Sequence, residues 1–195
     1  PDSKKGCINI LNLLDNKSTI IEAHINNIEF MTLSSDCKYL ASASDKGTLI
    51  RIFSLIDYSL IKELRRGSDQ AKIIDIKFSN DIKYLLCSSD KGTIHIFNAL
   101  VDTEENNNTG IYGINSIKDY LPSYFSSEWS YRQFYLPGIL TISTFKDNAN
   151  KIYSIGSDGT LYTLEFNEKD AKIIDTTKFI SNEDDPFSER KSTII

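Results

Sequence analysis

The feature that most constrains the fold of this chain is a sequence that occurs twice. The first copy reads KYLASASDKGTLIRIFSL from Lys38 and the second reads KYLLCSSDKGTIHIFNAL from Lys83, so the two copies lie 83 − 38 = 45 residues apart. Repeats of about this length are typical of the four-stranded blades of β-propellers. We therefore expect an all-β, WD-type propeller built from antiparallel four-stranded blades.

Each copy belongs to a series of short β runs separated by turns. The runs NNIEFMTL, KYLASAS, TLIRIFSL and SLIKELR make one set of four, and two later sets of four follow it. Apolar and polar residues alternate around Ile74, Ile76 and Phe78, which favours strands with one buried face. The DKG and SDG steps predict hairpin turns, because glycine adopts positive φ without strain.

The repeats predict only part of a propeller. Gly92 and Gly159 occupy equivalent turns 159 − 92 = 67 residues apart, so this interval holds 67 − 45 = 22 residues beyond one repeat. The remaining length amounts to somewhat under four repeats, and the opening KGCINILN copies KGTIHIFN, a later strand of its repeat. Exposed strand edges tend to find partners. We expect these edges to pair with a missing N-terminal half or with a second copy of the chain.

Composition narrows the classes of function. A net charge of −5 argues against nucleic-acid binding through a general basic field. The sequence contains no apolar run long enough to span a membrane and no signal-peptide pattern, so we expect any membrane contact to be peripheral. Cys7, Cys37 and Cys87 lack CxxC spacing and are interpreted as buried free thiols of a reducing compartment.

The sequence does not predict an enzyme. His24 and His95 are the only histidines, and no HExxH, GxSxG or GxxxxGK[ST] motif occurs. Asp45, Asp90 and Asp158 occupy equivalent turns, where hairpin geometry explains them better than acid–base catalysis does. We expect no catalytic residues, no cofactor and no metal.

A short basic block, Leu64-Arg65-Arg66-Gly67, lies between the two copies. Consecutive side chains of an extended strand leave on opposite faces, so Arg65 and Arg66 are expected to serve different pockets, one toward each neighbouring blade. Guanidinium groups suit phosphate because they form paired, charge-assisted hydrogen bonds. The DKGT turns offer further donors, since glycine lets the backbone approach a phosphate closely.

Several blocks together resemble the PROPPIN family, the seven-bladed propellers that bind polyphosphoinositides and include the WIPI proteins. The family signature is a Phe/Leu-Arg-Arg-Gly block, and this chain has the leucine form. The blocks occur in the order of the family: PDSKKGCINILNL, SASDKGTLIRIF, ELRRGSDQAKI, SSDKGTIHIF, LPSYFSSEWSYRQF and SIGSDGTLYTLEF.

The resemblance implies that the chain is the C-terminal half of such a propeller, about three and a half blades. We expect residues 1–180 to form the partial propeller and residues 181–195 to form a flexible tail. Within the partial propeller, we expect the end of blade four at 1–23, blade five at 24–67, blade six at 68–136 with a long loop at 101–127, and blade seven at 137–180.

The resemblance also implies two lipid-binding sites. Site one is expected to contain a histidine, hydroxyls, one turn and two arginines: His24, Ser42, Ser44, Lys46, Gly47, Thr48, Arg51 and Arg65. Site two is expected to contain groups of the next copy together with the second arginine: Arg66, Gly67, Ser88, Ser89, Lys91, Thr93 and His95.

Each of these assignments has a structural alternative. His24 lies at a blade boundary, where WD-type repeats often have a hydrogen-bonded histidine without a ligand. Asp-Lys-Gly turns close hairpins in many propellers that bind nothing there. The third copy, around Ser157 to Thr160, has the same turn but no arginine pair beside it, so we predict no site there.

The insertion consists of two different halves. VDTEENNNTG is polar and without periodicity, whereas Ile114, Ile117 and Leu121 recur at the spacing of one helical face. In the family, the corresponding loop inserts apolar residues into the bilayer, and we expect that role for Ile111, Tyr112, Ile114, Ile117 and Leu121. The pattern alone favours ordinary packing on the blade rim.

The expected function is therefore binding of phosphoinositide headgroups, phosphatidylinositol 3-phosphate and/or the 3,5-bisphosphate, with recruitment of autophagy or membrane-trafficking partners. The expected location is the cytoplasm, peripherally on phagophore, endosomal, vacuolar or other organelle membranes. The alternative is a WD-type scaffold that binds acidic peptides without lipid. Because histidine titrates near neutrality, we also expect protonation of His95 to strengthen anion binding on acidification.

Overall fold

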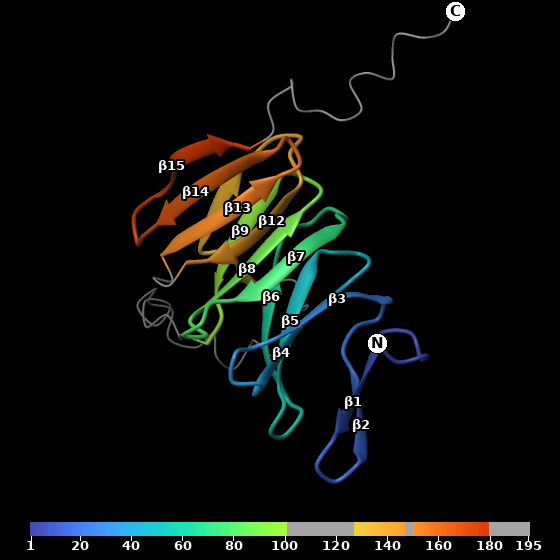
Figure 1. Cartoon of the computed structure of the whole chain (residues 1–195). Coiled ribbons are helices and arrows are strands. Elements are labelled where there is room, and N and C mark those ends of the chain that lie inside the picture. The colour runs from blue at the N-terminus through green and yellow to red at the C-terminus, as the bar shows by residue number, and fades with distance from the viewer. Residues whose placement is uncertain (101–126, 147–149, 180–195) are drawn as a thin grey trace, which may run out of the picture.

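The computed structural model describes residues 1–100, 127–146 and 150–179. All of the regular secondary structure in these residues is β, arranged as sheets that follow one another along the chain (Figure 1). The predicted all-β, WD-type partial propeller is confirmed. No helix in the described part of the chain could cross a membrane.

The first sheet is a hairpin of two strands. β1 (Cys7–Asn12) pairs antiparallel with β2 (Lys17–Glu22), from Cys7 opposite Glu22 to Asn12 opposite Lys17. One face of this hairpin carries Ile8, Ile21 and Ala23, which are buried against Leu40 and Phe53 of the next sheet. The hairpin therefore packs on its neighbour as the outer half of a blade does.

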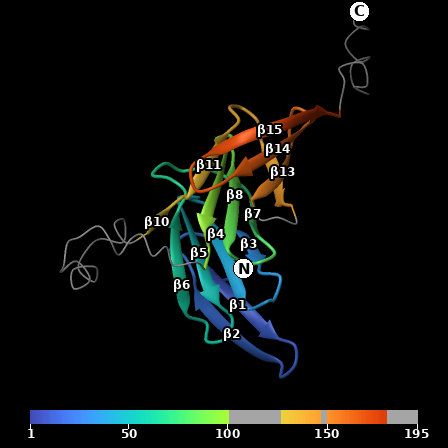
Figure 2. The same cartoon turned by 90° about the vertical axis from the view of Figure 1, so that its left-hand side faces the viewer.

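The second sheet has five strands where the repeat predicts four. β3 (Ile28–Leu33), β4 (Tyr39–Ser44), β5 (Leu49–Ser54) and β6 (Leu60–Arg65) form the expected antiparallel set. β10 (Glu128–Trp129) then adds to β6 in parallel, as Figure 2 shows at the outer edge of this sheet. The chain thus returns from the insertion to this sheet before it completes the next one.

The third sheet contains the second copy of the repeat. β7 (Ile73–Phe78), β8 (Tyr84–Ser89) and β9 (Thr93–Asn98) are consecutive, and β11 (Arg132–Tyr135) completes the sheet beyond the insertion. β7 contains the alternation predicted at Ile74, Ile76 and Phe78, and β8 and β9 lie within the second copy of the repeat.

The fourth sheet ends the described chain. Its strands lie in sequence order and are all antiparallel: β12 (Thr141–Phe145), β13 (Lys151–Gly156), β14 (Thr160–Phe166) and β15 (Ala171–Lys178).

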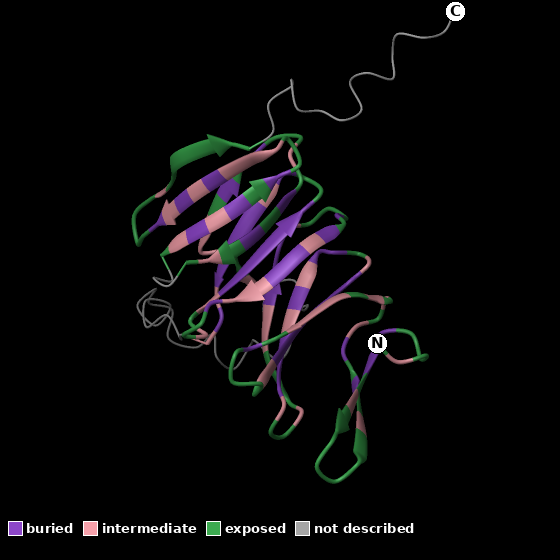
Figure 3. Ribbon diagram, viewed as in Figure 1, coloured by how far each residue is buried: buried purple, intermediate pink, exposed green. Residues whose placement is uncertain are grey.

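The core lies between the sheets, where β4, β5, β8 and β9 bury most of their residues (Figure 3). Ile50, Ile52 and Leu64 of the second sheet pack against Ile76 and Phe97 of the third. An equivalent cluster joins the third and fourth sheets: Leu86, Ile94, Ile96, Phe134, Leu136, Ile152, Tyr162, Leu164 and Phe166. Burial of this apolar surface is the main stabilising term of the fold.

The turns of the repeat fix the spacing between neighbouring sheets. Gly47 has φ 63°, and a Cβ placed on it would lie 1.8 Å from the carbonyl oxygen of Ala71. Gly92 has φ 71°, and its Cβ would lie 2.3 Å from the carbonyl oxygen of Leu136. Both turns therefore require glycine for conformation and for close backbone contact.

The two copies are not in simple register throughout. Ser42 is opposite Arg51, whereas the equivalent Cys87 is opposite His95, because the first copy has one extra residue after its turn. Arg51 and His95 therefore occupy equivalent places in their sheets. The repeat spacing shortens from 45 to 44 residues at this point, since 95 − 51 = 44.

One prediction from the sequence is wrong, and several concern residues that the structure does not describe. Cys7 and Cys87 are buried free thiols as expected, but the expectation for Cys37 is wrong, because it is exposed in a turn at φ 57°. Residues 101–126 of the loop expected at 101–127 lie outside the described residues, and so does the tail expected at 181–195. The residues expected in the bilayer are among those not described: Ile111, Tyr112, Ile114, Ile117 and Leu121. The blade numbering stays a prediction.

Candidate functional site

Arg65 and Arg66 leave the end of β6 toward different neighbours. Arg65 shares its face of the strand with Glu63, which pairs with Arg51 on the side of the β1–β2 hairpin. Arg66 runs the other way, and its guanidinium interacts electrostatically with Cys87 and His95 of the third sheet. The strand geometry thus separates the two arginines, one to each inter-sheet boundary.

Both arginine side chains are more enclosed than expected for an open rim. Arg65 is 6% exposed and Arg66 is 7% exposed. Arg65 Nε donates to Ser127 Oγ at 2.7 Å, and Arg66 Nε donates to the carbonyl oxygen of Gly47 at 2.8 Å. Arg66 Nη2 also donates to the carbonyl oxygen of Asp69. The acceptors of these hydrogen bonds are a hydroxyl and two carbonyl oxygens, and they hold the guanidinium groups in place.

At the first boundary, His24 is hydrogen-bonded within the protein. Its Nε2 lies 3.0 Å from Ser42 Oγ and 3.3 Å from the Ser42 carbonyl oxygen. Burial and the nearby charge of Arg51 lower the pKa of His24 to about 4, so its imidazole is neutral at pH 7. Of the two readings, this geometry is typical of the hydrogen-bonded boundary histidine.

Arg51 belongs to the same boundary but has a carboxylate partner. Its Nε and Nη2 both donate to Glu63 Oε2, at 2.9 and 2.7 Å, and its Nη1 donates to the carbonyl oxygen of Ala23 at 2.7 Å. The charge of Arg51 is therefore balanced locally, and its donors tie the second sheet to the hairpin.

At the second boundary, two buried polar atoms have no hydrogen-bond partner among the described residues. These are Ser89 Oγ and His95 Nε2. His95 Nδ1 lies 3.3 Å from Ser130 Oγ. Buried polar groups are nearly always hydrogen-bonded. Two such atoms on the neighbouring strands β8 and β9, one of them in a histidine that interacts with Arg66, mark this place as a candidate site for a polar ligand.

The expectation that His95 becomes charged near neutrality is wrong. Burial, and secondarily the charge of Arg66, lower the pKa of His95 to about 4. Only 4% of this residue is exposed, so an imidazolium would be poorly solvated there. At neutral pH His95 offers a hydrogen bond rather than a charge.

Ser88 lies on the opposite face from the other residues predicted for site two. It is fully buried, and its Oγ donates to the carbonyl oxygen of Thr141 in the fourth sheet at 2.7 Å. Alternation along β8 explains this, because Cys87 faces the second sheet and its neighbour must face away. We therefore correct the prediction for Ser88, which has a structural role.

The turn residues frame the two boundaries. Lys46 and Lys91 are exposed, Gly47 and Gly92 are buried, and the carbonyl oxygen of Thr48 accepts hydrogen bonds from the backbone N–H groups of Arg66 and Gly67. The remaining predicted residues are buried or half-buried, on strands or directly beside them: Ser42, Ser44, Thr48, Gly67 and Thr93.

A family model described as PROPPIN matches residues 7–171. The chain belongs to the PROPPIN family. Autophagy-related protein 18e of Arabidopsis thaliana is 34% identical to this PROPPIN chain over 171 residues, covering 87% of the chain and 45% of the relative. SVP1-like protein 2 of Saccharomyces cerevisiae is 34% identical over 146 residues, covering 69% of the chain and 33% of the relative.

Solved structures agree with this assignment. The structure described as Kluyveromyces lactis Hsv2 with complete loop 6CD has a TM-score of 0.72 and 26% identity to this PROPPIN chain, covering 90% of it and 57% of that structure. A complex of KlAtg21 with the coiled coil of AgAtg16 has a TM-score of 0.70 at 24% identity, covering 92% and 51%, which shows likeness of fold. The chain spans less than half the length of the two curated relatives above.

Sequence reasoning missed three residues of these boundaries. Glu63, one residue before the LRRG block, could have been found from its position opposite Arg51 in an antiparallel pair. Ser127 is the last residue of the predicted loop and Ser130 follows it, and no repeat pattern places them beside Arg65 and His95.

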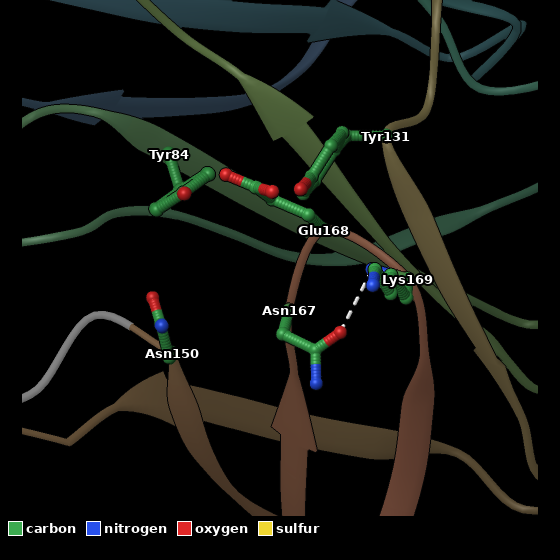
Figure 4. Close-up of a pocket in the computed structure, with 6 residues that line it drawn as sticks. All are labelled: Tyr84, Tyr131, Asn150, Asn167, Glu168 and Lys169. Atoms are coloured by element: carbon green, nitrogen blue, oxygen red, sulfur yellow. Dashed lines mark hydrogen bonds between the residues drawn. The ribbon is translucent and has the colours of Figure 1, made fainter.

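Two hollows lie near the sheets but do not suit a phosphate. One, of about 430 Å³, is lined by Glu29, Asp45, Asp90, Gln70, Ala71 and Lys72, so carboxylates dominate its charge. The other, of about 420 Å³, is shown in Figure 4, where Glu168 lies between Tyr84 and Tyr131. It is completed by Asn150, Asn167 and Lys169, and contains none of the predicted site residues.

Proposed function

We propose that this PROPPIN chain binds phosphoinositide headgroups at two boundaries of a partial propeller and so attaches peripherally to organelle membranes. The proposed ligands are phosphatidylinositol 3-phosphate and/or the 3,5-bisphosphate. Family membership supports this class of function, and relatives whose names are autophagy-related support the cellular process.

One observation carries the proposal. Arg65 and Arg66 are adjacent, but their guanidinium groups are held at different inter-sheet boundaries by neutral acceptors. A guanidinium that keeps its charge in a desolvated place interacts strongly with an anion, because the local dielectric constant is low. Two such groups in a chain of net charge −5 favour local anion sites over a general basic surface.

Site two, as we propose it, centres on Arg66. Its Nη1 has no hydrogen-bond partner in the part of the chain that the structure describes. Ser89 Oγ and His95 Nε2 also lack a hydrogen-bond partner among these residues. A phosphate oxygen accepts hydrogen bonds from guanidinium, hydroxyl and imidazole groups alike. Binding of one phosphate would therefore satisfy several groups at once, whereas Ser88 takes no part.

Site one, as we propose it, depends on Arg65 more than on Arg51. Glu63 already neutralises Arg51, so a phosphate would gain little charge interaction from it. Ser42, Ser44 and Thr48 supply hydroxyls near the same boundary, and all three are buried. We expect site one to be the weaker of the two, because its second arginine is committed within the protein.

Two modest sites on one rigid edge would make membrane attachment steep in lipid density. Once one headgroup is held, the second site meets a high effective concentration of lipid in the same bilayer. Two adjacent arginines, each at its own boundary, would supply these two sites.

Protein partners are proposed as well. The structural neighbour whose title describes KlAtg21 in complex with the coiled coil of AgAtg16 motivates autophagy-type partners for this chain. The remaining blades, from a missing N-terminal half or a second copy, are further proposed partners, because the β1–β2 hairpin has only two strands.

The competing proposal is a WD-type scaffold whose arginines bind an acidic peptide. Liposome flotation separates the two, using phosphatidylcholine vesicles with and without phosphatidylinositol 3-phosphate. Lipid binding predicts flotation only with the phosphoinositide, and loss of flotation in Arg65→Thr/Arg66→Thr. No flotation of the unchanged chain with either the mono- or the bisphosphate would contradict the lipid proposal.

A matched control removes the same amount of charge elsewhere. Lys38 and Lys83 occupy equivalent positions in the two copies, and their side chains are 59% and 60% exposed. They lie at the opposite ends of β4 and β8 from the DKG turns. Lys38→Thr/Lys83→Thr should float as the unchanged chain does.

A further inference from the structure

β10 is the one strand of the described chain that the repeat does not account for, and it is fixed beside Arg65. Three interactions hold this strand and the residue before it. Ser127 Oγ accepts from Arg65 Nε at 2.7 Å, Glu128 Oε2 lies 3.1 Å from Lys62 Nζ, and the backbone pairs in parallel with β6. The Lys62 side chain is only 10% exposed, so this ion pair is partly shielded from solvent.

The register places Trp129 directly opposite Arg65 and Glu128 opposite Leu64. Residues directly opposite one another in a sheet project from the same face, and the Lys62–Glu128 pair agrees with this alternation. Trp129 therefore leaves β10 on the face that Arg65 leaves on β6. The other face carries Leu64, which is buried in the core.

β10 is also the outermost strand of its sheet (Figure 2). Neighbouring strands lie about 4.8 Å apart, so Trp129 stands roughly one strand spacing outward from Arg65. Its side chain is large and apolar, yet 54% of the residue is exposed. A lipid whose headgroup reached Arg65 from outside the sheet would bring the bilayer surface against this indole.

We propose that Trp129 is an interfacial membrane anchor of site one. We expect the Trp129 side chain to lie in the headgroup region of a bilayer. Tryptophan favours that region because its ring can lie among apolar groups while its N–H is hydrogen-bonded. This inference rests on the proposed lipid function and deepens it. Arg65 selects the phosphate, and Trp129 makes binding to a lipid in a membrane tighter than binding to the same headgroup in solution.

Trp129 is the only tryptophan in the sequence, so its fluorescence reports this position alone. The probes are phosphatidylcholine vesicles containing phosphatidylinositol 3-phosphate, plain phosphatidylcholine vesicles, and soluble inositol 1,3-bisphosphate. We expect a blue shift of the emission maximum, and quenching by brominated lipid, with the phosphoinositide vesicles only. Co-sedimentation of the same samples measures binding independently of the fluorescence.

Trp129→Ala should weaken binding to the phosphoinositide vesicles roughly tenfold and leave binding of the soluble headgroup unchanged. Unchanged headgroup binding also shows that the variant is folded. The control is Ile56→Ala, since Ile56 is 74% exposed in the turn at the far end of β6. It should bind vesicles as the unchanged chain does.

The outcomes separate this inference from the proposed function. Vesicle binding without a blue shift, or undiminished vesicle binding by Trp129→Ala, overturns the anchor and leaves lipid recognition standing. A chain that binds neither the vesicles nor the soluble headgroup overturns the proposed function, and the anchor with it.

Discussion

Arg51 and Glu63 face one another across β5 and β6, with Arg51 Nε and Nη2 at 2.9 and 2.7 Å from the same carboxylate oxygen, Glu63 Oε2. Their side chains are 23% and 12% exposed. Arg51 also donates to the carbonyl oxygen of Ala23, so this pair connects β5 and β6 to the residue that follows β2, across a sheet boundary. The arginine that resembles a ligand in the sequence is thus a structural link.

Removing the carboxylate should therefore cost stability. We expect Glu63→Ala to lower the free energy of unfolding by about 2 kcal/mol, because it leaves a largely buried guanidinium without its partner. Arg51→Ala/Glu63→Ala should recover part of that loss. Urea unfolding of the single and double variants measures both values, and strictly additive losses would contradict the coupling.

The two histidines should make stability depend on pH. Burial lowers the pKa of His24 and of His95 to about 4, against 6.5 in the unfolded chain. The unfolded state then binds more protons between these values, so stability should be greatest above pH 6.5 and fall as the pH drops toward 4, by on the order of 1–3 kcal/mol per histidine.

Thermal unfolding across this pH range tests the dependence. His24→Gln/His95→Gln removes both titrating groups and keeps hydrogen-bonding capacity, so its stability should vary less between pH 6.5 and 4. An equally steep dependence in this variant would show that other groups are responsible.

The sequence predicted the architecture because the repeat carries it. The strand sets starting at Ile28, Ile73 and Thr141 follow from alternation and from turn chemistry, which are local properties. β10 was not predictable, because its pairing with β6 joins segments separated by an insertion and involves two residues only. Burial of the arginines was not predictable either, since it depends on Ser127 and on the carbonyl oxygen of Gly47.

Some errors have a specific cause in register. The sequence treats Ser88 and Ser89 alike, but in a strand one of two neighbours must face away from a given boundary. The extra residue after the first turn likewise hides the equivalence of Arg51 and His95. When the two copies are aligned at their DKG turns alone, the residues after the turn are therefore assigned to the wrong face of the strand.

Ser88 and Ser89 provide a matched pair for testing this distinction. Ser88→Ala should lower stability by about 1 kcal/mol, because it leaves the buried carbonyl oxygen of Thr141 without this donor, and should leave headgroup binding unchanged. Ser89→Ala should leave stability nearly unchanged and weaken headgroup binding several-fold. Chemical unfolding and calorimetric titration measure the two effects; the reverse pattern would contradict the assignment of faces.

The turn glycine at position 47 should be intolerant of substitution. Gly47→Ala would place a Cβ 1.8 Å from the carbonyl oxygen of Ala71, at a φ of 63°, and should destabilise the chain by about 3 kcal/mol or more. Gly67→Ala is the control, since a Cβ there meets nothing within 4 Å. Similar melting temperatures for the two variants would contradict the close turn contact.

The central claim is that Arg65 and Arg66 each hold a separate headgroup. Calorimetric titration with soluble inositol 1,3-bisphosphate tests it most directly, because the stoichiometry counts the sites without any contribution from a membrane. We predict two headgroups per chain for the unchanged protein, one for Arg65→Thr, one for Arg66→Thr and none for the double variant. A single headgroup per unchanged chain, or loss of both sites by either single substitution, would contradict the account.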